Sequence, residues 1–170
     1  MPISEWNQDS LVWRFVMTDD GPDFYETPGF EPPAAWLLAI AAVARDLWCL
    51  RYGRDVQVER LVWELAITDQ YAVTIGWRGP GVGGFNLCQG VSMEAPYPQA
   101  TVWVADTAQG ELTGYEFIQW PSRGRHILNP RLRQEEPVWV DPHTGTAVAA
   151  IGELCEQRTA WDALDRHPGE

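Results

Sequence analysis

The segment formed by residues 32–52 constrains the fold most, because it is apolar around most of the circumference of a helix. One stripe at helical spacing comprises Trp36, Ile40, Val43 and Leu47. A second stripe, which widens the first, comprises Leu37, Ala41, Ala44 and Trp48. Prolines begin the segment, arginines crowd its end and a glycine follows, in the usual order of helix start and stop signals. The sequence therefore predicts a long helix that is largely buried against a sheet.

Runs of alternating apolar residues, rich in β-branched and aromatic side chains, predict that sheet. The expected strands are residues 11–17, 61–67, 71–77, 85–91, 101–105, 112–120 and 138–140. The second and third runs are joined by a short polar turn, which is typical of a hairpin, and the runs at 101–105 and 112–120 are expected to form another. A turn is expected at residues 19–23.

These elements predict an α+β fold in which residues 1–170 form a single domain. Its twisted antiparallel sheet is packed by one long apolar helix, residues 32–52, and a short C-terminal helix is expected at residues 153–166. Residues 1–31 are expected to be an acidic N-terminal segment held down by its aromatic side chains. The length of 170 residues suits one domain of this kind.

The charge is strongly acidic, with 24 Asp and Glu against 12 basic residues, all of them Arg, for a net charge of -12. Such a chain lacks the general cationic surface that nucleic-acid binding requires, so no nucleic-acid partner is expected. The absence of Lys excludes a lysine Schiff base and a P-loop lysine.

The charge is also unevenly distributed. Residues 1–31 contain seven acidic residues and one basic residue, whereas residues 120–134 contain four arginines and no acidic residue. This arginine rim consists of Arg123, Arg125, Arg131 and Arg133. It is interpreted either as a solvated loop or as an anion-binding surface, since Arg binds carboxylates and phosphates in bidentate fashion.

The start of the chain has no signal-peptide pattern, and its longest apolar stretch is shorter than the roughly 20 residues that cross a bilayer. The three cysteines are widely spaced and form no CxxC pair. A cytoplasmic protein with reduced thiols and no membrane contact is therefore expected. Cys49 and Cys155 are expected to be inert core thiols.

Ten tryptophans are a heavy load for a chain of this length. Core packing accounts for most of them, since aromatic side chains bury large areas. Some are expected to line a groove or an interface, where Trp often supplies strong contacts. Trp77, Trp120 and Trp139 are the candidates for this binding role.

The glycine-rich stretch at residues 79–84 does not match a phosphate-binding pattern, because no Lys-Ser/Thr pair or helix start follows it. It is interpreted as a lid or as a plain connection, and the sequence does not decide between them.

Candidate acid/base residues are few. Asp141 and His143 flank a proline in a turn, and His126, Tyr71 and Glu64 complete the set. A structural interpretation stands beside this one, in which Asp141 caps its own turn and His143 points to water. The sequence Asp-Pro-x-x-Gly favours the structural interpretation, because it is typical of tight turns.

The stretch from Trp120 to Leu154 resembles part of an uncharacterised actinobacterial protein family. The family pattern is W-P-x-C with a following His, then W-x-C-P-x-T-G, then I-G-x-L, and Trp120, His126 and Trp139 are among the matching residues. The Cys/His set of that pattern implies a small zinc site. Here Arg123 or a neighbour stands at the first Cys position and Asp141 at the second. No metal and no other cofactor are therefore expected.

Two functions are compatible with these features. The first is a non-enzymatic binding or accessory protein of a bacterial cytoplasm, such as an immunity-type inhibitor or a pathway chaperone that engages a cationic protein. The alternative is a small cofactor-independent enzyme with an aromatic-lined acid/base pocket, for which a closed cavity holding two or more of the acid/base candidates is required. A protein partner is expected, and a small-molecule ligand and a homodimer stay open.

Overall fold

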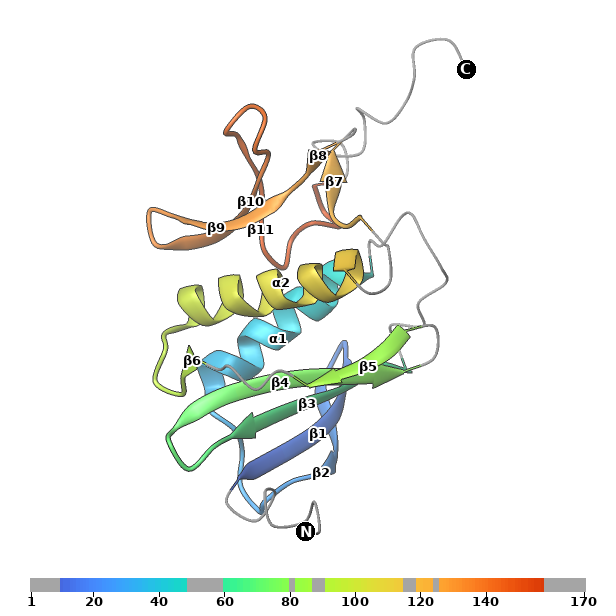
Figure 1. The fold of residues 1–170 in the computed structure, drawn as a ribbon, viewed down its shortest axis with the longest axis vertical. Helices are drawn as coiled ribbons and strands as arrows, with labels where there is room; N and C mark the ends of the chain where they lie inside the picture. The colour runs from blue at the N-terminus through green and yellow to red at the C-terminus, as the bar shows by residue number, and fades with distance from the viewer. Residues whose placement is uncertain are drawn as a thin grey trace.

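Helix α1 (Ala34–Leu47) lies between the main sheet and helix α2 (Tyr97–Gly114) in the computed structural model (Figure 1). The structure describes residues 10–48, 60–79, 82–86, 91–114, 119–123 and 126–157. Eight residues of α1 are buried, including Trp36, Ile40, Val43 and Leu47 of the predicted stripe. The predicted helix is therefore confirmed over these bounds, and residues 49–52 lie outside the described residues.

The main sheet is antiparallel, with the strand order β2-β1-β3-β4-β5 and with β6 paired to β4. The predicted first strand and the predicted hairpin at 61–77 are confirmed. Strand β2 was not expected, because Gly21, Pro22 and Asp23 resemble a turn, yet β2 pairs with β1 along its length. The bounds are β1 (Leu11–Thr18), β2 (Gly21–Glu26), β3 (Val62–Ile67), β4 (Ala72–Gly79), β5 (Val82–Asn86) and β6 (Val91–Ser92).

Helix α2 corrects the prediction of a hairpin at residues 101–120. The β-branched and aromatic residues at 101–104 favour a strand locally, but Ala100, Val104, Ala108 and Leu112 recur every four residues and are buried. This spacing forms one face of a helix, and α2 packs against α1. The described part of the chain thus contains a second long helix, which packs on the side of α1 that faces away from the main sheet. None of the helices in the described ranges is long and apolar enough to cross a membrane.

The C-terminal part of the chain forms two further small sheets, with the order β11-β10-β9 in one and β7-β8 in the other. The expected strand at 138–140 is confirmed within β10. Residues 154–157 form turns instead of the start of the expected helix, and residues 158–166 lie outside the described residues. The bounds are β7 (Ser122–Arg123), β8 (His126–Ile127), β9 (Asn129–Arg133), β10 (Glu136–Val140) and β11 (Ala147–Ala150).

The glycine-rich stretch at 79–84 joins two paired strands. Gly79 ends β4, Val82 begins β5, and the two residues are partners in the antiparallel ladder. Residues 80–81 lie outside the described residues. The pairing favours a hairpin connection over a lid, because both flanks of the stretch are committed to the sheet.

A buried carboxylate joins α1 to the C-terminal part of the chain. Asp46 is fully buried, and its Oδ2 accepts hydrogen bonds from Trp139 Nε1 and Gly152 N, both at 2.7 Å. Its Oδ1 accepts a third from Leu154 N at 3.0 Å. Gly152 has a φ of 104°, and a Cβ there would lie 3.1 Å from that of Ala42. The close approach of this turn to α1 therefore requires glycine.

Cys155 is disulfide-bonded, and its partner lies outside the described residues. Its Sγ lies 3.5 Å from the carbonyl oxygen of Arg45 in α1. The prediction of an inert, reduced thiol is wrong for this residue. The spacing of the cysteines did not reveal it, because the contact between Cys155 and α1 joins residues that are far apart in the sequence. The cysteine argument for a cytoplasmic location no longer holds. Cys49 lies outside the described residues.

The Asp46 contacts predict a specific dependence of stability on pH. Burial raises the pKa of Asp46 to about 6, although the three hydrogen bonds and the charge of Arg45 act to lower it. In the unfolded chain the same group titrates near pH 4. The folded state thus binds the proton more tightly, so the free energy of unfolding falls as the pH rises from about 4 to about 6, by about 3 kcal/mol from this group.

Chemical denaturation across that pH range measures this contribution. Asp46→Asn removes the titration, so the wild type is expected to lose about 3 kcal/mol relative to this variant between pH 4 and pH 7. Asp106→Asn, at an exposed position on α2, serves as the control and should keep the wild-type slope. Parallel pH profiles for the wild type and Asp46→Asn would contradict the raised pKa.

Candidate functional site

Six of the residues that the sequence singled out between 120 and 154 lie in one region, here called the C-terminal corner: Trp120, Arg123, His126, Trp139, Asp141 and His143. Its base is the pair Trp120 and Trp139, whose rings meet edge to face at 5.4 Å. Both side chains are buried, and Trp139 is held by Asp46. Trp120 Nε1 has no hydrogen-bond partner among the described residues. These two tryptophans therefore have the position of core residues and offer no ring surface to a partner.

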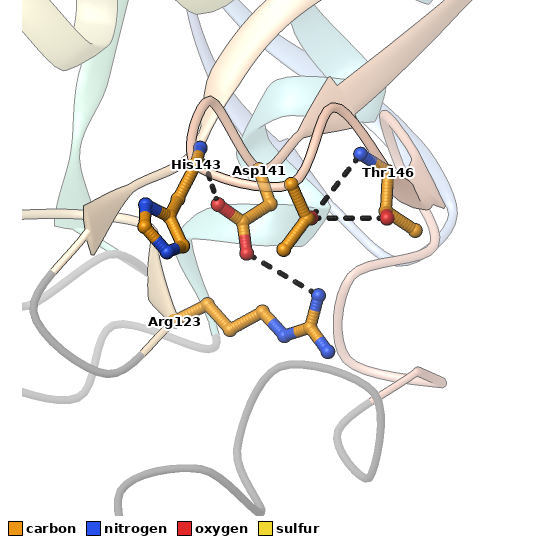
Figure 2. A network of polar contacts seen from close by, with 5 residues as sticks. Arg123, Asp141, His143 and Thr146 are labelled. Carbon is orange, nitrogen blue, oxygen red and sulfur yellow. Dashed lines mark hydrogen bonds and ion pairs between the residues drawn. The ribbon is translucent and has the colours of Figure 1, made fainter.

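The corner also contains an ion pair between Arg123 and Asp141, which Figure 2 shows. Asp141 is 3% exposed, and its Oδ2 lies 3.3 Å from Nη1 of Arg123. Its Oδ1 accepts a hydrogen bond from His143 N at 2.9 Å. Its main chain closes the turn, because Gly145 N donates to Asp141 O and Asp141 N donates to Thr146 O. Asp141 thus caps its own turn, as the structural interpretation of the sequence predicted.

The protonation state of Asp141 follows from these partners. Burial acts to raise its pKa, but the N–H groups of His143 and Thr144 and the charges of Arg123 and His126 outweigh that effect. The net result is a pKa below the ordinary value. Asp141 is therefore a fixed anion at neutral pH, whereas a general base works best with a pKa near the operating pH.

The two histidines of the corner stack on each other. The rings of His126 and His143 are nearly parallel, at an interplanar angle of 5° and a centroid distance of 4.6 Å, and both residues are exposed. His143 thus faces solvent as predicted, with a neighbouring ring on one side. No group of three or more His, Cys, Asp or Glu side chains in the described ranges is placed to hold a metal ion.

The other acid/base candidates lie elsewhere. Glu64 on β3 forms an ion pair with Arg14 on β1, at 3.0 Å between Oε2 and Nε, and Arg14 also pairs with Glu26 on β2. This cross-strand network explains Glu64 as a sheet residue. Tyr71 lies in the β3–β4 turn. The structure therefore brings together Asp141, His126 and His143, but not the predicted set of five.

The remaining binding candidates, the arginine rim and Trp77, lie in different elements of the structure. Trp77 is buried in β4, where its ring meets that of Trp63 edge to face at 5.2 Å. Arg131 and Arg133 are exposed and occupy alternate positions of β9, so their side chains leave the same face of the strand. Arg123 is engaged by Asp141, and Arg125 lies outside the described residues.

A groove that the sequence did not reveal lies near the start of α1. It has a volume of about 560 Å³ and is formed by four segments that are distant in sequence. Phe30 and Tyr71 stand on its walls and are 55% and 69% exposed. The lining residues are Leu11, Trp13, Phe30, Glu31, Pro32, Pro33, Ile67, Thr68, Asp69, Tyr71 and Met93. In Figure 1 the β3–β4 turn that forms one wall lies well away from β7 and β8 of the C-terminal corner.

The polar groups of this groove suit a cation. Its described lining contains the carboxylates of Glu31 and Asp69 and no basic side chain. In the β3–β4 turn the N–H groups of residues 68, 70, 71 and 72 all donate hydrogen bonds to acceptors within the turn. Met93 N donates to Tyr71 O. Pro32 and Pro33 have no N–H to offer. An anion would thus find few donors there.

Tyr71 adopts a strained backbone conformation. Its φ of 59° lies in the left-handed region, which an aromatic residue rarely occupies and which costs about 1 kcal/mol. The ring is mostly exposed, so it gains little burial in return. Strain of this kind is concentrated at functional sites, which marks the tip of the groove wall as a candidate.

The ion pair of the C-terminal corner is expected to stabilise the fold. Arg123→Met and Asp141→Asn should each lower the free energy of unfolding by about 2 kcal/mol, between the values for exposed and buried pairs. The double variant should lose about 1 kcal/mol less than the sum, because the two groups contact each other. Denaturant titration measures all four proteins. Arg131→Met, which removes an exposed arginine, is the control, and strict additivity of the pair would contradict the coupling.

Tyr71→Asn is expected to leave stability unchanged or to raise it by up to about 1 kcal/mol. Asn tolerates the left-handed conformation and keeps the backbone hydrogen bonds of the turn. Tyr25→Asn, which also removes a mostly exposed ring but from β2, is the control for loss of aromatic surface. Thermal and urea unfolding test this prediction, and a loss above about 1 kcal/mol for Tyr71→Asn would show that the ring packs more than its exposure indicates.

Comparisons with protein-family models, with curated proteins and with solved structures found no match to this chain. Its function must therefore be argued from its own surfaces. Within the described residues two places qualify by geometry: the C-terminal corner, where Arg123 and Asp141 are engaged with each other, and the groove, whose lining includes two acidic residues and two exposed rings.

Proposed function

We propose that this protein is a non-enzymatic binding or accessory protein that engages a cationic protein partner, in the manner of an immunity-type inhibitor or a pathway chaperone. One observation carries the proposal: an acidic and aromatic surface along β2 and the segment that leads to α1, residues 19–31, here called the acidic edge. Its exposed acidic and aromatic residues are Asp19, Asp20, Asp23, Tyr25, Glu26, Phe30 and Glu31. No basic residue occurs between Arg14 and Arg45.

The aromatic residues of the acidic edge favour a binding surface over a surface that only protects the edge strand from unwanted pairing. Strand β2 ends the strand order of the main sheet, and charges on such a strand commonly prevent unwanted pairing. Protection explains the carboxylates, but it does not explain Tyr25 and Phe30, which are 71% and 55% exposed. Exposed aromatic side chains within a charged rim are typical of contact surfaces.

The charge of the acidic edge favours a foreign partner over a second copy. In a symmetric dimer each surface patch meets itself, so this edge would bring like charges together. A cationic partner instead gains from the field of a chain with a net charge of -12.

The enzyme alternative is less well supported. Three of its candidates meet in the C-terminal corner, but Asp141 has a lowered pKa and is engaged by Arg123. Of the five candidates, only Tyr71 lines the groove among the described residues. Loss of a measurable activity in both His143→Ala and Asp141→Ala, in folded protein, would favour the enzyme over the binding protein.

The salt dependence of binding tests the proposal. The partner is captured from the source organism at low salt, identified by mass spectrometry and purified. Because screening shortens the range of charge attraction, the affinity should fall at least about tenfold between about 50 and about 500 mM salt. Affinity that does not change with salt would contradict a charge-driven partner.

A matched pair of variants locates the effect on the surface. Neutralising three acids of the acidic edge, by Asp19→Asn, Asp20→Asn and Asp23→Asn, should slow association several-fold at low salt. The control neutralises three exposed acids elsewhere, by Asp106→Asn, Glu136→Gln and Glu153→Gln, which changes the net charge equally. Equal slowing in both would assign the effect to net charge and not to this edge.

A further inference from the structure

We infer that the groove holds a basic side chain of that partner, an Arg or Lys on an extended segment, with its alkyl stem along the apolar walls and its charge toward Glu31 and Asp69. This inference rests on the proposed function and specifies the contact through which the partner is recognised. It draws on the composition of the lining, on the exposed rings and on the continuity of the groove with the acidic edge.

The sign of the charge is set by the two carboxylates. Glu31 and Asp69 come from different walls, the segment before α1 and the β3–β4 turn, so a cation in the groove is attracted from two directions. The start of α1 acts against a cation, but a helix end amounts to roughly half a charge. Two full negative charges outweigh it. Glu31 is also a residue of the acidic edge, so the groove continues that surface.

The walls suit the stem of a long side chain. Leu11, Pro33 and Met93, all at least partly exposed, supply apolar surface. Trp13 is buried and fixed, because its Nε1 donates to Phe30 O at 2.7 Å. The exposed rings of Phe30 and Tyr71 can contact a guanidinium or ammonium group through their faces. Arg and Lys combine an apolar stem with a charged end. This combination matches a groove whose lining is mostly apolar and includes two exposed acidic residues.

The conformation of Tyr71 supports the same occupant. The turn keeps an aromatic residue at a left-handed position where Asn or Gly would be easier to accommodate. The ring of Tyr71 is kept at the expense of backbone strain and gains little burial in the free protein. A contact between this ring and a bound side chain explains why the position is aromatic.

The probe for the experiment is the blocked peptide acetyl-Ala-Leu-Arg-Leu-Ala-amide. Its matched control carries citrulline, the neutral isostere, in place of Arg. Binding is followed at low salt by ¹H–¹⁵N chemical-shift titration of the full chain. We expect the arginine peptide to shift the amides of residues 68–71 and 93, and the citrulline peptide to bind at least about tenfold more weakly, as expected for the loss of one charge contact.

Two pairs of variants sharpen the test. Glu31→Gln with Asp69→Asn should weaken binding about tenfold or more, whereas Asp106→Asn with Glu156→Gln, which changes the net charge equally, should stay within about twofold. Tyr71→Asn should weaken binding several-fold, and Trp48→Asn, which removes an exposed ring at the end of α1, should not. Circular dichroism and the spectrum of each free variant establish that it is folded.

The outcomes separate this inference from the proposed function. Equal binding of the citrulline peptide, equal weakening by both double variants, or no binding of the arginine peptide would overturn the groove as a basic side-chain site. If the partner binds with the expected salt dependence while the groove variants leave its affinity unchanged, the inference fails and the proposed function stands. If the partner binds independently of salt, the proposed function fails, whatever the peptide does.

Discussion

The packing of the C-terminal part of the chain against α1 depends on the carboxylate of Asp46. Helix α1 is apolar on nearly all sides, so it needs cover on the side that faces away from the main sheet as well as on the sheet side. Asp46 provides a polar point on that helix, and three donors from the C-terminal part of the chain converge on it. A buried charge is tolerated only when it is fully hydrogen-bonded, so these contacts fix which segment returns to α1 and in what register.

The Asp46 contacts give a structural role to the I-G-x-L residues of this chain and to the Trp of the W-x-C-P-x-T-G pattern. These residues therefore need no functional site to explain them. Trp139 and the N–H groups of Gly152 and Leu154 hold Asp46, and only glycine fits at the closest approach to the helix. At the two positions where the resembled pattern has Cys, Arg123 and Asp141 bind each other. The C-terminal corner is thus closed by its own contacts, and binding is better sought on the opposite part of the molecule.

Local patterns made much of the fold predictable, and long-range contacts account for the rest. The stripe of α1, the alternation in β1, β3 and β4, and the turn at Asp141 act over neighbouring residues, so they could be inferred from sequence. Helix α2 was missed because Thr101, Val102 and Trp103 favour a strand, while burial against α1 favours the four-residue spacing of Ala100, Val104, Ala108 and Leu112. The groove was missed because its lining joins four separate segments, which no local pattern records.

In the proposed function, the acidic edge and the groove have different roles in recognition, for physical reasons. Charge attraction acts over a screening length of about 10 Å, so the acidic edge influences how fast a cationic partner arrives but discriminates poorly among cations. Discrimination needs contacts that form only at short range, where a stem fits between apolar walls and a charge meets placed carboxylates. Because such contacts are lost only on separation, the groove would govern dissociation of the proposed partner. Under this proposal, a surface with the edge alone would bind basic proteins indiscriminately, and the groove would make one basic segment preferable to another.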